Sequence, residues 1–178
     1  AKIFKFIRQF LKHLHHEEIL KSTKYQRLQY PSEVETHAVV LTKEEVVQLM
    51  RYQPDTPSQE KVKDLFLVLI FTGLRFSDGV RISRSWLKGE FLVVNTQKTG
   101  ERISIPIHSH LKEILVKYDF DLKPLVISNQ KFNDYVKTLC EKAEINEMVE
   151  VVKYDKGRKV YEALPKYKLI SSHTGRRT

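Results

Sequence analysis

Apolar residues recur at intervals of three and four in five parts of the chain, and this spacing predicts helices. The five segments are 1–20, 42–50, 56–73, 108–118 and 129–143. In the third segment every position from Leu65 to Phe71 is apolar. A helix of that composition is expected to be buried.

Local signals mark where two of these helices begin and where one ends. Thr42 with Glu45 three positions later forms a capping box, and Thr56-Pro57 combines a capping side chain with proline at the first helical position. Gly73 follows the apolar stretch and is expected to end the helix in a left-handed conformation.

Two pairs of β-rich segments predict two hairpins. The first pair is 91–94 and 103–107, and the second pair is 149–154 and 159–164. A short helical turn is expected near residues 76–77, and a last helix is expected to begin at His173 with Ser171 or Ser172 as its cap. The predicted fold class is α+β, mainly helical, with small antiparallel hairpins.

The polarity of the chain changes after its first helix. Residues 1–20 are expected to be the end of a helix, residues 21–40 are polar and contain Pro31, and the predicted hairpins and most predicted helices lie in 41–178. We therefore expect a helical fragment of one domain, a linker, and a second domain over 41–178.

Composition narrows the possible functions. The single cysteine, Cys140, argues against a disulfide framework and a cysteine-rich zinc site, and it fits a buried free thiol in the cytoplasm. No run of eighteen apolar residues occurs, so no membrane span is expected. The net charge of +9 is segregated, with +5 in residues 1–30, +6 in 151–178 and −2 between them. This pattern favours DNA or RNA binding over surface lysines that only confer solubility.

Four polar residues occupy positions from which they could bind a phosphate. Arg75 directly follows the buried helix, Lys98 lies near a hairpin tip, and His173 and Arg176 share one face of the last helix. Each has a simpler explanation, because Arg75 could pair with Asp78 and the other three could be solvated. Their combination is more informative than any one of them.

Three motifs in this order resemble those of the tyrosine recombinases, or phage-type integrases. They are FTGLRFSD at 71–78, QKT at 97–99 followed by the strand ISIPI at 103–107, and HTGR at 173–176. The approach to the last motif, KYK at 166–168, is similar to that in integrases of mobilizable and conjugative elements. The resemblance covers about residues 38–178, and 1–20 resembles the last helix of the family's core-binding domain.

The resemblance implies a function and a mechanism. The expected activity is DNA integration or recombination through a 3′-phosphotyrosyl intermediate, with no metal or other cofactor. Arg75 and Arg176 would bind the non-bridging phosphate oxygens, Lys98 would protonate the leaving 5′-oxygen, and His173 would assist. Asp78 would orient Arg75 or cap its turn.

The resemblance also implies partners, and the chain departs from the family pattern at three points, one of which is that most of the family's DNA-clamping N-terminal domain is absent. All eight tyrosines precede the last motif, so none is assigned as nucleophile and this chain alone is expected not to cleave DNA. Arg177 stands where many members have a second histidine. Expected partners are double-stranded DNA and a homotetramer in a bacterial cytoplasm, without membrane or small-molecule substrate. Expected backbone contacts come from Lys153, Lys156, Arg158, Lys159, Lys166, Lys168 and Arg177.

Three other functions remain open at this stage. A non-catalytic DNA-binding module or degenerate recombinase would share the charge pattern but lack a downstream tyrosine. An unrelated phosphotransfer or hydrolytic enzyme using His173 and Arg176 would need a carboxylate or metal cluster, and the sequence shows no convincing ligand spacing. A basic structural protein would not explain an arginine placed next to the core.

Overall fold

A computed structural model describes residues 2–28, 38–155 and 158–178, and the chain divides into two units between residues 36 and 37. The first unit contains helix α1 (Lys2–His16) and the 3₁₀ turn η1 (Lys24–Arg27). On α1, the apolar side chains of Ile3, Phe6 and Phe10 are exposed. The predicted linker 21–40 includes η1, and residues 29–37 of that linker lie outside the described residues.

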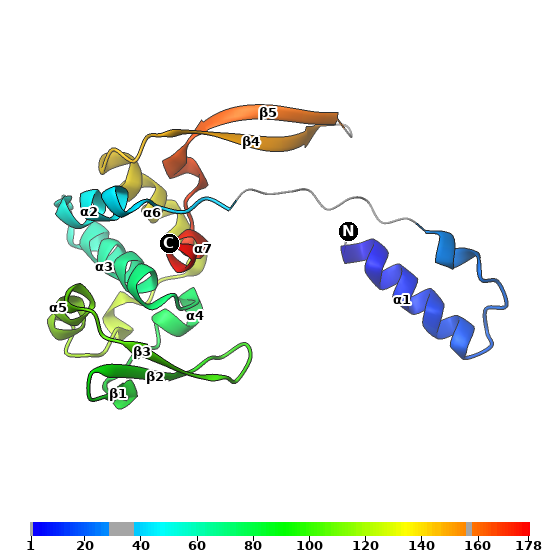
Figure 1. Cartoon of the computed structure of the whole chain (residues 1–178), viewed down its shortest axis with the longest axis horizontal. Helices are drawn as coiled ribbons and strands as arrows, with labels where there is room; N and C mark the ends of the chain where they lie inside the picture. Colours follow the sequence, from blue (N-terminus) through cyan, green and yellow to red (C-terminus); the bar gives the residue numbers. More distant parts are fainter. Residues whose placement is uncertain (1, 29–37, 156–157) are drawn as a thin grey trace. The chain divides into compact units, whose positions relative to one another are not determined.

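The second unit is a helical core with a small sheet on each of two opposite sides (Figure 1). Its helices are α2 (Lys43–Arg51), α3 (Pro57–Thr72), α4 (Phe76–Gly79), α5 (Ser109–Lys117), α6 (Asn129–Lys142) and α7 (Ser172–Arg177), with 3₁₀ turns η2 (Arg84–Trp86), η3 (Lys123–Leu125) and η4 (Lys166–Leu169). Its strands are β1 (Leu87–Lys88), β2 (Phe91–Asn95), β3 (Arg102–Pro106), β4 (Met148–Asp155) and β5 (Arg158–Pro165). The predicted α+β class, mainly helical with small antiparallel sheets, is confirmed.

The predicted helix ends are confirmed at the residues that carried the signals. The Thr42 side chain accepts from the Glu45 N–H and the Glu45 carboxylate accepts from the Thr42 N–H, which is a complete capping box. Thr56 caps α3, and Gly73 ends it with φ of +64°. These signals depend on contacts within four residues, so they could be recognised without the fold.

Both predicted hairpins form, and the first gains a strand that the sequence did not reveal. β2 pairs with β3 with Val93 opposite Ser104, and the two-residue strand β1 pairs with the other edge of β2. β1 is too short to show an alternating pattern, so only its pairing identifies it. β4 and β5 pair over eight residues with Val151 opposite Glu162.

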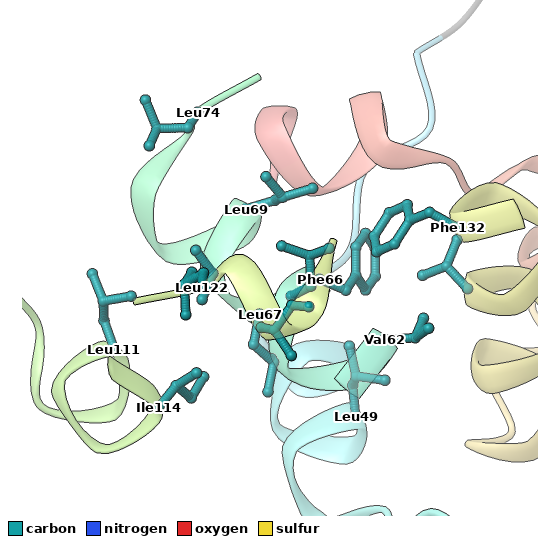
Figure 2. Close-up of a cluster of buried hydrophobic side chains, with 14 of the residues drawn as sticks. Leu49, Val62, Phe66, Leu67, Leu69, Leu74, Leu111, Ile114, Leu122 and Phe132 are labelled. Atoms are coloured by element: carbon teal, nitrogen blue, oxygen red, sulfur yellow. The ribbon is translucent and has the colours of Figure 1, made fainter. Parts of the chain in front are cut away.

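Helix α3 is the centre of the hydrophobic core. Leu65, Phe66, Val68 and Leu69 are fully buried, as its composition predicted. The ring of Phe66 meets the ring of Phe132 on α6 edge-on, with 6.2 Å between centroids. Figure 2 shows these two rings together, with Leu49 from α2 and Leu111 from α5 approaching the same helix. Helices α2, α5 and α6 therefore all pack on α3.

The remaining predictions from composition concern the cysteine and the membrane. Cys140 is a buried free thiol, and burial raises its pKa to about 12, so it is expected to be unreactive at neutral pH. Among residues 2–28, 38–155 and 158–178, no helix has the length and hydrophobicity that crossing a bilayer requires.

The close packing of α7 on α3 predicts the effect of one added methyl group. A Cβ at Gly175 would lie 2.8 Å from Cε2 of the buried Phe66 ring and 3.3 Å from Cβ of Leu69. We expect Gly175→Ala to lower the free energy of unfolding by about 1–3 kcal/mol, because the clash outweighs the gain in helix propensity. Chemical denaturation would measure the loss.

Arg177→Ala is the matched control for this prediction, since Arg177 is the exposed neighbour on the same helix. Equal stability of Gly175→Ala and the control would contradict the close approach of α7 to α3.

Candidate functional site

The turn that carries Arg75 is fixed by the end of α3. The Gly73 N–H donates to the Leu69 carbonyl at 3.0 Å, and the left-handed conformation of Gly73 turns the chain back toward the core. Leu74 is then buried, and Arg75 begins α4 as its N-terminal cap residue, half-buried. The backbone of Arg75 therefore lies between the buried Leu74 and the start of α4.

The role expected for Asp78 is corrected by the structure. Its buried carboxylate does not pair with Arg75. Instead, Oδ1 accepts a hydrogen bond from the Gln97 N–H at 2.9 Å and lies 3.7 Å from Nη1 of Arg81. Sequence separation explains the error, because Gln97 is nineteen positions away and its approach depends on the hairpin docking beside α4.

Lys98 lies in the turn between β2 and β3, and its side chain is exposed. The turn is closed by the Thr96 N–H donating to Glu101 at 2.9 Å and by the Gly100 N–H donating to Thr96 at 2.9 Å. Gly100 has a φ of +70°, a conformation that suits glycine. The neighbouring Gln97 is the residue bonded to Asp78, so the turn is attached to α4 at its base while the Lys98 side chain is exposed.

Helix α7 carries His173 and Arg176, which are both exposed and one turn apart. Its start is held by α6, because the Asn133 side-chain oxygen accepts from the Ser172 N–H at 2.8 Å. Its middle lies on α3, where Gly175 contacts Phe66. The expected start at His173 is one residue late, since Ser171 is the cap and Ser172 the first helical residue.

The backbone segments of the three motifs lie next to one another. A Cβ at Gly73 would be 3.9 Å from the carbonyl oxygen of Arg176, so the end of α3 meets α7 directly. Figure 1 shows α4 between α7 and the β1–β2–β3 sheet, and the Asp78–Gln97 hydrogen bond joins α4 to that sheet. The side chain of Lys98 is exposed on the turn, and among the described residues no hydrogen bond joins it to Arg75, His173 or Arg176.

The seven expected DNA contacts separate into four groups, of which Lys166 forms the last. Lys159, Lys168 and Arg177 are exposed. Lys153 is also exposed, but it forms an ion pair with Glu162 across the β4–β5 hairpin. The side chains of Lys156 and Arg158 lie outside the described residues.

The expectation that Lys166 contacts the DNA backbone is wrong. It is buried, and its ammonium donates to Glu45 at 2.7 Å and to Glu147 at 3.2 Å. Burial lowers the pKa of Lys166, but these two hydrogen bonds outweigh burial, and the pKa lies above its usual value. Lys166 therefore joins α2 to the base of the β4–β5 hairpin and is not available to DNA. Its partner Glu45 is 121 positions away, so the sequence carried no signal for the pair.

The candidate site has little capacity for a metal ion. Within the described ranges, no three His, Cys, Asp or Glu side chains are grouped closely enough to hold one. The polar groups around α4, α7 and the β2–β3 turn are mainly cationic, and such groups bind oxyanions such as phosphate. The chemistry that this arrangement can perform is therefore phosphate binding with proton donation.

Comparison with solved structures identifies the fold. A lambda integrase fragment (residues 75–356 of that protein), solved as a dimer bound to a core site, matches with a TM-score of 0.69 and 16% identity over 98% of this chain and 60% of that chain. The lambda integrase catalytic core matches with a TM-score of 0.54 and 18% identity over 78% of each chain. The integrase from mycobacterium phage Brujita matches with 0.52 and 15% over 97% of this chain and 53% of that chain.

The protein therefore has the fold of a tyrosine-recombinase, or integrase, catalytic domain. The chain spans 60% of the lambda integrase fragment bound to a core site and 45% of a lambda integrase chain solved as a tetramer on a Holliday junction. No protein-family model and no curated protein matches the sequence. At identities of 15–18%, the likeness is one of fold.

The buried hydrogen bond at Asp78 gives a prediction about the β2–β3 turn. Asp78→Ala would leave the Gln97 N–H without its partner, and we expect a loss of about 1–3 kcal/mol in the free energy of unfolding. We also expect faster amide hydrogen exchange at Gln97 and Lys98 in the folded protein. Mass spectrometry or NMR would measure the exchange.

Glu90→Ala is the control, because Glu90 is an exposed carboxylate in the turn between β1 and β2, at the end of β2 opposite the β2–β3 turn. Unchanged exchange at Gln97 in Asp78→Ala would show that the turn does not depend on this hydrogen bond.

Proposed function

We propose that this chain is the phosphate-binding part of a site-specific DNA recombinase that cuts and rejoins DNA through a 3′-phosphotyrosyl intermediate. One observation carries the proposal. The segments bearing Arg75, Lys98 and the His173–Arg176 pair are adjacent in a fold that integrase catalytic domains share. The adjacency and the motif order are independent of each other, and both favour one phosphodiester as the ligand.

Each candidate residue has a role in this reaction. The tyrosine oxygen attacks phosphorus, a bond to the tyrosine forms, and the bond to the 5′-oxygen breaks. Arg75 and Arg176 stabilise the charge on the non-bridging oxygens, each by several kcal/mol. Lys98 donates a proton to the departing 5′-oxygen. Its exposed position on a turn lets its side chain approach that oxygen. His173 hydrogen-bonds the phosphate and assists proton transfer.

The second oxygen of Asp78 supports a further part of this proposal. Oδ2 is buried and has no hydrogen-bond partner among the described residues. An unpaired buried oxygen of this kind is unfavourable and calls for a donor. We propose that a donor supplied when DNA binds pairs with Oδ2, while Oδ1 continues to hold the β2–β3 turn.

We propose that the nucleophilic tyrosine lies outside these 178 residues. The eight tyrosines all precede His173, and Tyr118, for example, donates its hydroxyl hydrogen to Asp64 at 2.7 Å on α3. The 178-residue chain is then expected to bind duplex DNA without forming a covalent adduct. Assembly as a tetramer on DNA is part of the proposal, since a lambda integrase with this fold has been solved as a tetramer on a Holliday junction.

The exposed cations give a prediction about DNA affinity. We expect this chain to bind duplex DNA with an affinity that falls steeply as salt rises, because each neutralised phosphate releases counterions. Lys159→Ala and Lys168→Ala should each reduce the slope of log K against log salt by about 1. Fluorescence anisotropy at several salt concentrations would measure the slopes.

Lys166→Ala is the control for Lys159→Ala and Lys168→Ala, because it removes a nearby lysine that is buried. Its side chain is buried in ion pairs, so we expect lower stability with an unchanged salt slope. A reduced slope for Lys166→Ala, or a binding affinity that does not respond to salt, would contradict the assignment.

The arginines give a prediction about chemistry. In the longest natural form of the chain, Arg75→Ala and Arg176→Ala should each reduce covalent adduct formation on a nicked duplex by about 10²–10³-fold. DNA affinity should change only a fewfold, because many other cations contribute to binding. Arg84→Ala is a matched control, since Arg84 is exposed and pairs with the exposed Asp119. Equal losses of DNA binding and of adduct formation would show that the two arginines contribute to DNA binding and not to the chemical step.

A further inference from the structure

Arg81 lies beside the hydrogen bond that attaches the β2–β3 turn to α4. Its Nη1 is 3.7 Å from Oδ1 of Asp78, the same oxygen that accepts the Gln97 N–H at 2.9 Å. The Asp78 side chain is 1% exposed, whereas the Arg81 side chain is 48% exposed. One buried oxygen therefore faces both a backbone donor from the turn and a cation at the surface.

The backbone after α4 fixes the position from which the Arg81 side chain starts. The Arg81 N–H donates to the Asp78 carbonyl at 3.1 Å, and the next residue, Ile82, is fully buried. The Ile82 carbonyl in turn accepts from the Leu122 N–H at 3.0 Å. Because the backbone is already held, pairing with the carboxylate requires only the Arg81 side chain to be ordered.

The ring of Trp86 contributes to that order. Cζ of Arg81 is 5.7 Å from the centre of the Trp86 ring, which is within the range of a cation–π contact. Trp86 is half-buried, ends η2 and directly precedes β1, the strand that pairs with β2. The guanidinium therefore lies between the beginning of the three-stranded sheet and the carboxylate that holds the turn of the same sheet.

The Asp78 carboxylate has few groups to compensate its burial. Within the described residues, Oδ2 has no hydrogen-bond partner, and Arg81 is the one cation that forms an ion pair with this carboxylate. A charge removed from water is costly unless an opposite charge or hydrogen-bond donors compensate it. Without Arg81, the carboxylate would keep only the Gln97 N–H, and opening of this region to water would become more favourable.

We propose that Arg81 is a positioning residue for Lys98. Arg81 compensates the charge of Asp78, and Asp78 holds the Gln97 N–H at the base of the turn that carries Lys98. This role rests on the proposed function, in which Lys98 donates a proton to the departing 5′-oxygen. Loss of Arg81 would open the turn and lower the fraction of molecules in which Lys98 is placed to donate.

A direct contact with a DNA phosphate is the alternative role, because half of the Arg81 side chain is exposed. The two roles differ in the group through which they act. A phosphate contact would act on DNA affinity and its salt dependence and would not require Asp78. A positioning role acts through Asp78 and leaves the affinity within a fewfold.

The first test uses the 178-residue chain and does not depend on recombination. Arg81→Gln removes the charge and should raise amide hydrogen exchange at Gln97 by at least about fivefold, with exchange in α6 unchanged. The same change in an Asp78→Ala background should add nothing, because the two side chains act as one unit. A general loss of stability would instead raise exchange in both places.

Two further variants serve as matched controls. Arg81→Lys keeps the charge and should retain most of the protection at Gln97. Arg84→Gln removes an exposed arginine that pairs with the exposed Asp119, and it should leave exchange at Gln97 unchanged. Trp86 is the single tryptophan of the chain, so its fluorescence should change in Arg81→Gln and report the lost contact directly.

The second test concerns the chemical step in the longest natural form of the chain. On a nicked duplex whose bridging 5′-oxygen is replaced by sulfur, the phosphorus–sulfur bond breaks and a thiolate leaves without a proton donor, since a thiol is far more acidic than an alcohol. Lys98→Ala should slow adduct formation on ordinary DNA by about 10²-fold or more, and Arg81→Gln by a smaller factor. Both should recover on the sulfur substrate, whereas Arg75→Ala should not.

The outcomes separate the two proposals. Unchanged exchange at Gln97 in Arg81→Gln would overturn the positioning role, as would an equal effect in the Asp78→Ala background. A lower salt slope of DNA binding with unchanged exchange would identify Arg81 as a phosphate contact. Recovery of Lys98→Ala but not of Arg81→Gln on the sulfur substrate would also overturn the role. If Lys98→Ala does not recover, the proposed function of Lys98 is wrong, and exchange at Gln97 still decides whether Arg81 holds the turn.

Discussion

The contact between α7 and α3 determines the geometry of the candidate site. Gly175 lies directly on the Phe66 ring and on Leu69, and only a residue without a side chain allows this approach. Phe66 in turn is fixed by Phe132 on α6. Since Arg75 follows α3 and Arg176 belongs to α7, this buried contact places two arginines distant in sequence on neighbouring segments.

A second constraint is polar and equally buried. The Asp78 carboxylate receives the Gln97 N–H at 2.9 Å, so the β2–β3 turn is attached to the same region through one hydrogen bond. In a low-dielectric environment such a bond is costly to lose, because both groups would remain unsatisfied. The core thus packs directly against the segments that bear Arg75 and Arg176, whereas Lys98 lies on an exposed turn that is attached through its neighbour Gln97. This difference is compatible with the proposed phosphate binding by the arginines and proton donation by Lys98.

Lys166 supplies a third buried constraint. Its pairs with Glu45 and Glu147 tie the start of α2 to the base of the β4–β5 hairpin, close to the approach to α7.

The sequence by itself determined the secondary structure elements and the identity of the candidate residues. The Thr42–Glu45 box, the Gly73 cap and both hairpins were predictable, because each depends on contacts within a few residues or on a repeating pattern. The tertiary structure alone decided which polar groups are free. It buried Lys166 while leaving Lys168 exposed, and it paired Asp78 with Gln97 rather than Arg75. The physical reason is range: a cap is formed by neighbours in sequence, whereas a buried ion pair is formed by segments that meet only when the core closes.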